Sequence, residues 1–246
     1  MSYTECWEKA GVKTVHEISR CKDYEEYQTM AEANFNLVLH PEARFAAEDF
    51  HEKLRIPFIE LRRLYQIDKI TKQYQALGNV LGIPFEDHEA EAAALDSVKC
   101  LKSAKPDAVF AIGECMNGDP FELALALVKY GFRVAEIYGT LTAENFVYLK
   151  NLSELSPQTK VFSNMEPTML YYDPEESGVT ITIGKDACYY HPDVKKRDVE
   201  RRSAAVRICG CETFVRKTVG GVGDERIKKI SDTICTGSVG SSVGVI

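Results

Sequence analysis

The sequence predicts an α/β protein made of two Rossmann-like parallel β-α-β units. Two observations lead to this class. Short apolar runs, of the length of buried strands, alternate along residues 23–195 with stretches that have helical apolar spacing. Glycine or proline marks several of the expected helix ends. Strands that alternate with helices in this way form parallel sheets with right-handed crossovers.

The first unit is expected within residues 1–84. Its predicted elements, in order, are a helix over 23–34 with Asp23 as N-cap, a strand over 35–39, a helix over 42–54, a strand over 56–61 and an amphipathic helix over 67–81. The first strand ends at His40-Pro41, because proline cannot continue a central strand. Gly82 is placed to close the last helix.

The second unit is expected within residues 85–195, with the hinge between the units in the helical stretch 82–104. Its predicted elements are a helix over 87–103, a strand over 108–112, a helix over 120–130 capped by Asp119, a strand over 132–138, a helix over 142–152, a strand over 160–162, a helical turn over 166–172 and a strand over 179–184. The segment 196–246 combines charged residues with a Gly- and Ser-rich stretch, which favours a solvated helix and a loosely ordered tail.

Charge and hydropathy exclude several classes of protein. The chain of 246 residues carries a formal net charge of −7, whereas nucleic-acid binders usually show a basic surface, so no nucleic-acid partner is expected. No run approaches the roughly 18 apolar residues of a membrane span, and the first residues lack a signal pattern, so we expect a cytoplasmic protein without a membrane partner. There, the eight cysteines are expected to be free thiols or metal ligands.

Three loops that follow predicted strands carry the candidate site residues. Ligands of parallel sheets bind at the carboxyl ends of the strands. The loops are 40–44, with His40, Glu42 and Arg44; 113–118, with Gly113, Glu114, Cys115, Met116 and Asn117; and 184–191, with Cys188 and His191. The helix that follows the second loop is expected to offer unpaired N–H groups to an anion. Dinucleotide and P-loop glycine signatures are missing, so this chain is expected to bind no nucleotide.

Four side chains in these loops are candidate metal ligands. A thiolate at Cys115 would suit a soft metal or a nucleophile, although a single cysteine is more often a small buried hydrophobic residue. His40 is placed either to bind metal or to close its loop by a hydrogen bond. Cys188 and His191 lie three residues apart, which suits a shared ligand point or a structural cluster.

Two stretches resemble the nitrogenase component 1-type oxidoreductases. They are NFNLVLHPE at residues 34–42 and AAEDFHEKLRIPF at residues 46–58, which match an apolar strand, a ligand-bearing loop, a helix ending in Glu-Lys and a strand with Ile-Pro and an aromatic residue. The helix 67–81, the strand and loop 109–118 and the strand 133–138 follow in the family's order. The likeness runs from about residue 30 to residue 195.

The resemblance implies a cofactor and partners. Members of the family pair with component 1-type subunits in homo- or hetero-oligomers, and receive electrons from an iron-sulfur ATPase reductase. In nitrogenase proper, a cysteine near the position of His40 binds the active-site metallocluster, and the loop of Gly113, Glu114 and Cys115 packs against it. The resemblance therefore implies an iron-sulfur or other metallocluster, although the acidic Glu114 would repel an anionic one. The N-terminal domain that holds the family's relay cluster is largely missing, as in a shortened relative.

Three functional hypotheses follow. The first is a component 1-like oxidoreductase polypeptide or fragment, whose pocket lies where the loops of His40, of Glu114 and Cys115, and of Cys188 and His191 converge. The second is a non-catalytic scaffold or carrier for an iron-sulfur cluster or a cofactor precursor. The third is an unrelated α/β domain that binds a small molecule at a helix N-terminus.

Overall fold

The computed structural model describes residues 11–84, 88–114, 118–163, 165–174, 177–194, 196–197 and 244–245. These residues group into two compact units. The first takes its described residues from Met1–Arg63, Lys72–Glu86 and Gly223–Ile246, and the second from Leu64–Thr71 and Asp87–Val222. Both units combine helices with parallel strands, which confirms the predicted α/β class. None of the helices in the described part of the chain is long and apolar enough to cross a membrane.

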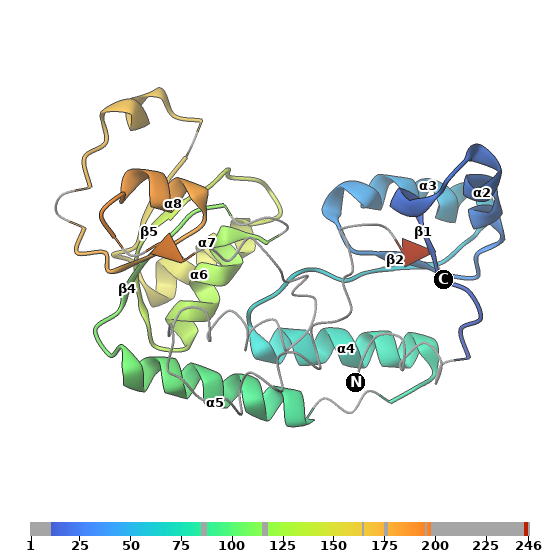
Figure 1. Ribbon diagram of the computed structural model, residues 1–246, viewed down its shortest axis with the longest axis horizontal. Coiled ribbons are helices and arrows are strands. Elements are labelled where there is room, and N and C mark those ends of the chain that lie inside the picture. Colours follow the sequence, from blue (N-terminus) through green and yellow to red (C-terminus); the bar gives the residue numbers. More distant parts are fainter. Residues whose placement is uncertain are drawn as a thin grey trace. The chain divides into compact units, whose positions relative to one another are not determined.

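The first unit is built on a mixed sheet with the strand order β1-β9-β2-β3 (Figure 1). Its elements are β1 (His16–Glu17), η1 (Ile18–Arg20), α2 (Tyr24–Thr29), η2 (Met30–Glu32), β2 (Asn36–Val38), η3 (Pro41–Ala43), α3 (Arg44–Leu54), β3 (Phe58–Glu60), the larger part of α4 (Ile67–Leu81) and β9 (Gly244–Val245). The residues of α4 up to Thr71 group with the second unit. Strands β2 and β3 are parallel and α3 connects them, as the sequence predicts. Asp23 caps α2 by accepting a hydrogen bond from the N–H of Glu26 at 2.8 Å.

Strand β9, like β1, is a part of this sheet that the sequence did not predict. Its two residues lie near the end of the chain and pair antiparallel with both β1 and β2. A two-residue strand has no periodic pattern, so neither β1 nor β9 produces a signal in the sequence. The expectation of a loosely ordered tail is therefore wrong for residues 244–245, and most of the rest of that tail lies outside the described residues.

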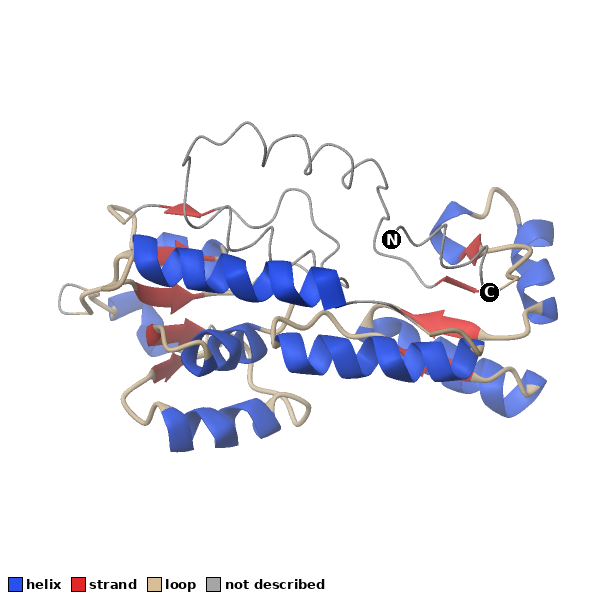
Figure 2. Ribbon diagram, turned by 90° about the horizontal axis from the view of Figure 1, so that it is seen from below, coloured by secondary structure: helices blue, strands red, loops and turns tan. Residues whose placement is uncertain are grey.

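The second unit is built on a fully parallel sheet with the strand order β6-β5-β4-β7-β8. Its elements are α5 (His88–Ala104), β4 (Val109–Ile112), α6 (Pro120–Lys129), β5 (Arg133–Tyr138), α7 (Phe146–Leu155), β6 (Lys160–Phe162), η4 (Pro167–Tyr171), β7 (Ile181–Ile183), α8 (Lys185–Tyr190) and β8 (Lys196–Arg197). Figure 2 shows the sheet's strands on edge with helices on both sides. Lys196 and Arg197 were expected in a solvated helix, and instead they form an edge strand beside β7.

The order in which the chain adds strands to the sheet reverses between β4 and β7. From β4 the chain moves outward through β5 to β6, and it then returns to the other side of β4 to form β7 and β8. Right-handed crossovers place α6 and α8 on opposite faces, because the two connections run in opposite directions. Ligands of such sheets bind where the strand order reverses, at the carboxyl ends of the strands. The fold thus places its switch point after Ile112 and Ile183.

The local sequence signals predict the start of α6 correctly and place the start of α7 too early. Asp119 accepts hydrogen bonds from the N–H groups of Phe121 and Glu122, and Pro120 opens the helix as expected. Helix α7 begins at Phe146 and not at the predicted Thr142. The Asn145 amide explains the delay, because it bonds the N–H of Thr142 and the carbonyl of Thr140 and holds both in the preceding loop.

A buried carboxylate joins α6 to the segment that leads into α4. Glu122 accepts hydrogen bonds from the N–H groups of Tyr65 and Gln66, at 2.8 and 3.1 Å, and from the side-chain amide of Gln66 at 3.0 Å. It lies within the second unit and is fully buried. Burial raises the pKa of Glu122 from 4.5 to about 6, against the opposing effect of these hydrogen bonds and of Lys69.

We expect Glu122→Gln to remove a pH dependence from the stability of the chain. Because the pKa is raised in the folded state, Glu122 stabilises the protein below its ordinary pKa of 4.5, and this contribution is lost as the pH rises through about 6. The lost contribution is about 2 kcal/mol. Urea unfolding at a series of pH values should show the free energy of unfolding of the wild type falling by this amount relative to the variant. Parallel pH profiles would contradict the prediction.

Candidate functional site

Three loops meet at the carboxyl edge of the five-stranded sheet. They follow β4, β5 and β7 and begin at Gly113, Gly139 and Gly184. The N–H of Gly113 donates to the carbonyl of Ile183 at 2.6 Å, which continues the pairing of β4 and β7 beyond the strands. The backbones of the loops after β4 and β7 are therefore in direct contact at the switch point.

Glycine is required where the loops after β4 and β7 touch. A Cβ on Gly113 would lie 2.7 Å from the backbone nitrogen of Ala187. A Cβ on Gly184 would lie 2.7 Å from the backbone of Gly113 and Glu114, and Gly184 also has a φ of +87°. Both neighbours are backbone atoms, which cannot move aside as a flexible side chain can. The sequence singled out Gly113 for its freedom of backbone conformation, and the structure adds this close approach as its physical role.

Glu114 ties the three loops together. Its N–H donates to the carboxylate of Asp186 on α8 at 3.0 Å. Its own carboxylate accepts from both the N–H and the hydroxyl of Thr140, at 3.3 and 3.2 Å, in the loop after β5. The side chain is otherwise exposed. This edge can therefore present a positioned carboxylate that accepts a proton or a cation from a ligand.

The expected anion site at the start of α6 is not available in the structure. Pro120 has no N–H, and the N–H groups of Phe121 and Glu122 are bound by the Asp119 side chain. The N–H of Leu123 donates to the Asp119 carbonyl. The cap thus uses the donors that an anion would need, and the prediction of unpaired N–H groups here is wrong.

His191 and Cys188 do not point to a common ligand position. The His191 Nε2 lies 2.7 Å from the Glu136 carboxylate, and His191 is 5% exposed. The Cys188 Sγ lies 3.4 Å from the hydroxyl of Thr182 in β7. Of the two interpretations that the spacing left open, this arrangement corresponds to the structural cluster. Glu136 and Thr140 were not among the site residues predicted from the sequence. The signal for Glu136 was its charge within the otherwise apolar strand 133–138.

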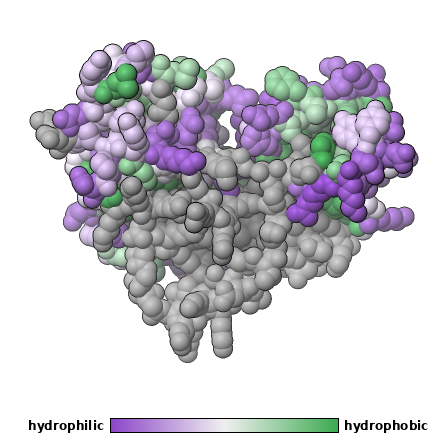
Figure 3. Space-filling model, turned by 45° about the horizontal axis from the view of Figure 1, so that its top comes forward, coloured by the Kyte–Doolittle hydropathy of each residue, from purple (hydrophilic) through white to green (hydrophobic). Residues whose placement is uncertain are grey.

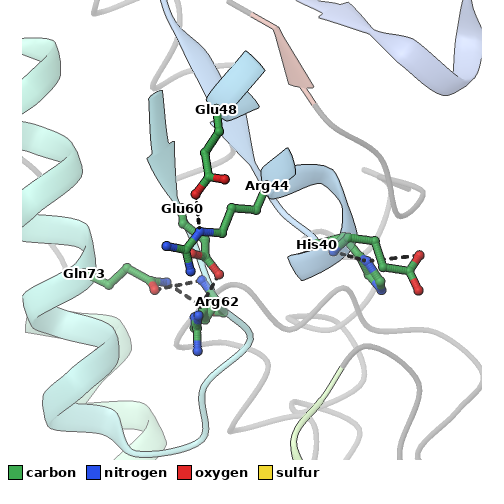
Figure 4. A network of polar contacts seen from close by, with 7 residues as sticks. His40, Arg44, Glu48, Glu60, Arg62 and Gln73 are labelled. Carbon is green, nitrogen blue, oxygen red and sulfur yellow. Dashed lines mark hydrogen bonds and ion pairs between the residues drawn. The ribbon is translucent and has the colours of Figure 1, made fainter. Parts of the chain in front are cut away.

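The remaining predicted site residues lie in the first unit or outside the described residues. His40, Glu42 and Arg44 follow β2, and the Arg44 Nε pairs with Glu48 at 2.8 Å (Figure 4). In the same view Arg62 pairs with Glu60 at 2.8 Å, and the Gln73 amide bonds both the N–H and the carbonyl of Arg62. The guanidinium of Arg44 is therefore already paired with a carboxylate. Cys115, Met116 and Asn117 lie outside the described residues.

The geometry of His40 favours loop closure over metal binding. Its Nδ1 accepts a hydrogen bond from the N–H of Glu42 at 3.3 Å, so in the neutral ring the proton sits on Nε2. A metal at Nδ1 would have to displace this hydrogen bond, and a metal at Nε2 would need the opposite tautomer, with the proton on Nδ1.

Taken together, the described donors do not form a site for a metal or an iron-sulfur cluster. No group of three or more histidine, cysteine, aspartate or glutamate side chains with ligand geometry occurs in the described ranges. The candidate ligands that can be examined are each engaged elsewhere: His191 with Glu136, Cys188 with Thr182 and His40 with Glu42.

The fold and this edge define a class, namely a doubly wound α/β protein with a polar site at its topological switch point. Residues 2–195 match the family model of the nitrogenase component 1 type oxidoreductases. The chain belongs to this family. The resemblance found in the sequence is thereby confirmed, and the hypothesis of an unrelated small-molecule-binding domain is wrong.

A solved structure described as "Nitrogenase Cp1 at pH 6.5" has a similar fold. Its TM-score is 0.59 at 16% sequence identity, and the likeness covers 82% of this chain and 47% of that chain. The present chain thus spans about half the length of the structure that it matches. No curated protein matches the chain.

We expect Gly184→Ala to destabilise the protein more than Gly178→Ala. Both glycines have a positive φ, but a Cβ on Gly178 meets nothing within 4 Å, whereas one on Gly184 meets backbone at 2.7 Å. The control substitution, Gly178→Ala, should lower the free energy of unfolding by about 1 kcal/mol, because alanine is disfavoured in a left-handed backbone conformation. Gly184→Ala should lower the free energy of unfolding by about 3 kcal/mol or more, because it adds a steric clash to a strained backbone conformation. Urea unfolding of both variants measures the difference, and equal losses would contradict the close approach.

We expect His191→Leu to lower the free energy of unfolding by about 2 kcal/mol, because it removes one of the three side-chain partners of the buried Glu136 carboxylate and leaves the hydroxyls of Tyr138 and Tyr172. His88→Leu is the matched control, since His88 is exposed at the start of α5 and its loss should have little effect. Denaturant unfolding followed by circular dichroism distinguishes the two. A small loss in His191→Leu would mean that the pair with Glu136 contributes little.

Proposed function

We propose that the chain is a component 1-type oxidoreductase polypeptide that contributes a pocket for reductive chemistry. In this proposal it assembles with component 1-type subunits, and a partner iron-sulfur ATPase reductase supplies the electrons. Family membership supports the oxidoreductase class. The observation that carries the position of the pocket is the arrangement of Glu114, held between Thr140 and Asp186 at the switch point.

The described side chains support a pocket for a polar substrate better than a complete cluster site. Glu114 offers a carboxylate whose position is held by two donors from Thr140. In the proposed reaction it would exchange a proton with a substrate that is being reduced, while the rigid glycine contact below it keeps the carboxylate in place. A metallocluster, if this chain helps to hold one, would supply the electron-transfer chemistry, and its ligands would come from residues outside the described part, such as Cys115, or from a partner subunit.

The second candidate function is a non-catalytic scaffold or carrier for an iron-sulfur cluster or a cofactor precursor. One observation favours it. The histidines and the cysteine of the described loops are engaged with protein groups, so they are not poised to hold a reactive cluster permanently. A carrier would release its metal group to a partner, whereas an oxidoreductase subunit would keep it through turnover.

The proposal is tested by anaerobic purification of the full chain with component 1-type partner subunits, followed by iron analysis and electron paramagnetic resonance. Cys115→Ser should lower the iron content, while the exposed Cys100→Ser is the matched control and should leave it unchanged. Glu114→Gln should lower reductive turnover in the presence of the reductase without changing the iron content, because it removes the proton-exchanging group.

Two outcomes would overturn parts of the proposal. Iron that leaves the chain when a partner protein is added would favour the carrier. Full turnover in Glu114→Gln and Thr140→Val would show that the pocket is not at this edge of the sheet.

A further inference from the structure

A group of aromatic rings in the second unit is not used by the proposed pocket. The Tyr138 ring stacks on Tyr190, with centroids 4.8 Å apart and planes at 14°. Tyr190 in turn meets the ring of Tyr189 edge-on at 5.1 Å. Tyr138 is fully buried, whereas Tyr189 is 76% exposed. Two ring contacts therefore connect the interior of the unit to its surface.

The inner end of this series of rings is hydrogen-bonded to a proton acceptor. The hydroxyl of Tyr138 donates to the Glu136 carboxylate at 2.7 Å. The same carboxylate oxygen lies 2.7 Å from the His191 Nε2, and the other oxygen accepts from the hydroxyl of Tyr172 at 2.5 Å. Glu136 is 1% exposed. A phenol with a carboxylate at hydrogen-bond distance can lose its proton without any movement of heavy atoms.

Burial and the neighbouring Glu136 raise the pKa of Tyr138 well above its ordinary value, and they raise the pKa of Tyr172 in the same way. The phenols therefore stay protonated over the whole physiological range. An electron can then leave Tyr138 at low energy only if its proton leaves at the same time, because a buried phenol cation has no solvation. Glu136, at 2.7 Å, is the nearest group that can accept this proton, and the His191 Nε2 lies farther away at 3.3 Å.

We propose that Tyr138 is a redox-active tyrosine that gives up one electron to an oxidant at the surface of the protein. The oxidant belongs to the class of one-electron acceptors such as oxygen-centred radicals. It removes an electron from Tyr189, and an electron from Tyr138 replaces it through Tyr190. In the same step the O–H bond of Tyr138 breaks and the proton forms an O–H bond with Glu136. The net change is a neutral Tyr138 radical, a protonated Glu136 and an oxidant reduced by one electron.

The geometry explains why the electron comes from Tyr138 and not from the rings on the way. Among the residues that the structure describes, no carboxylate accepts a hydrogen bond from the hydroxyl of Tyr189 or Tyr190, whereas the Tyr138 hydroxyl donates to Glu136. A proton acceptor in place lowers the energy needed to remove the electron. Tyr172 also donates to Glu136, so it is the second site that can hold the radical.

Such a group would protect the second unit of the chain from oxidative damage. A radical stored on a buried ring is shielded from cysteine and methionine side chains at the surface until a reductant returns the electron. This inference does not depend on the proposed pocket, since it uses neither Glu114 nor a metal group.

The test uses the full chain and photo-generated ruthenium(III) tris-bipyridine as the one-electron oxidant, with electron paramagnetic resonance as the readout. The wild type should give a long-lived tyrosyl radical. Tyr138→Phe should lose most of this signal, and Tyr189→Phe should slow its formation. The control Tyr171→Phe, which removes another highly exposed phenol, should leave both the yield and the rate unchanged.

Two further measurements test the movement of the proton, and the first of them needs no substitution. Formation of the radical in the wild type should slow in deuterium oxide, because a proton moves with the electron. Glu136→Gln keeps the shape of the side chain and should shift the signal to short-lived surface radicals. An unchanged radical signal in a folded Tyr138→Phe variant would overturn the proposal. It would also be overturned if radical formation showed neither a deuterium isotope effect nor a slowing in Tyr189→Phe. The aromatic rings would then be a structural network.

Discussion

The second unit depends on the contact between the loops after β4 and β7. Gly113 and Gly184 bring two backbones so close that neither position has room for a Cβ. This contact closes the base of the switch point and sets where α8 begins. Asp186 can then bind the N–H of Glu114, and Glu114 in turn can reach Thr140. The position of the candidate pocket is therefore a consequence of two missing side chains.

Two buried carboxylates stabilise the same unit in different ways. Glu122 accepts hydrogen bonds from N–H groups just before α4, and these donors offset part of the cost of its burial. Glu136 is surrounded by side-chain donors from Tyr138, Tyr172 and His191, which come from three separate elements. The first carboxylate fixes a connection of the fold. The second fixes the packing of α8 on the sheet, and it also provides the proton acceptor that a redox-active tyrosine needs.

Family membership and the local geometry constrain the function differently. The family model covers residues 2–195 and places the chain in the nitrogenase component 1 type oxidoreductase family. The engaged states of His40, Cys188 and His191 argue against a complete cluster site in the described loops. Figure 3 shows polar and apolar side chains interspersed among the described residues that are visible on this face. The proposed polar pocket at Glu114 is compatible both with the family and with the donors that are present.

The sequence by itself determined the elements whose signals are local. Asp119, Pro120 and the spacing of apolar residues placed α6, and Gly82 placed the end of α4, because caps and periodicity act within a few residues. It also placed Gly113 and Glu114 at a strand end. Only the tertiary structure paired β9 with β1 and β2, and only it brought His191 to Glu136, 55 residues away in sequence. Partners so distant in sequence leave no local pattern, since their contact exists only after the chain has folded.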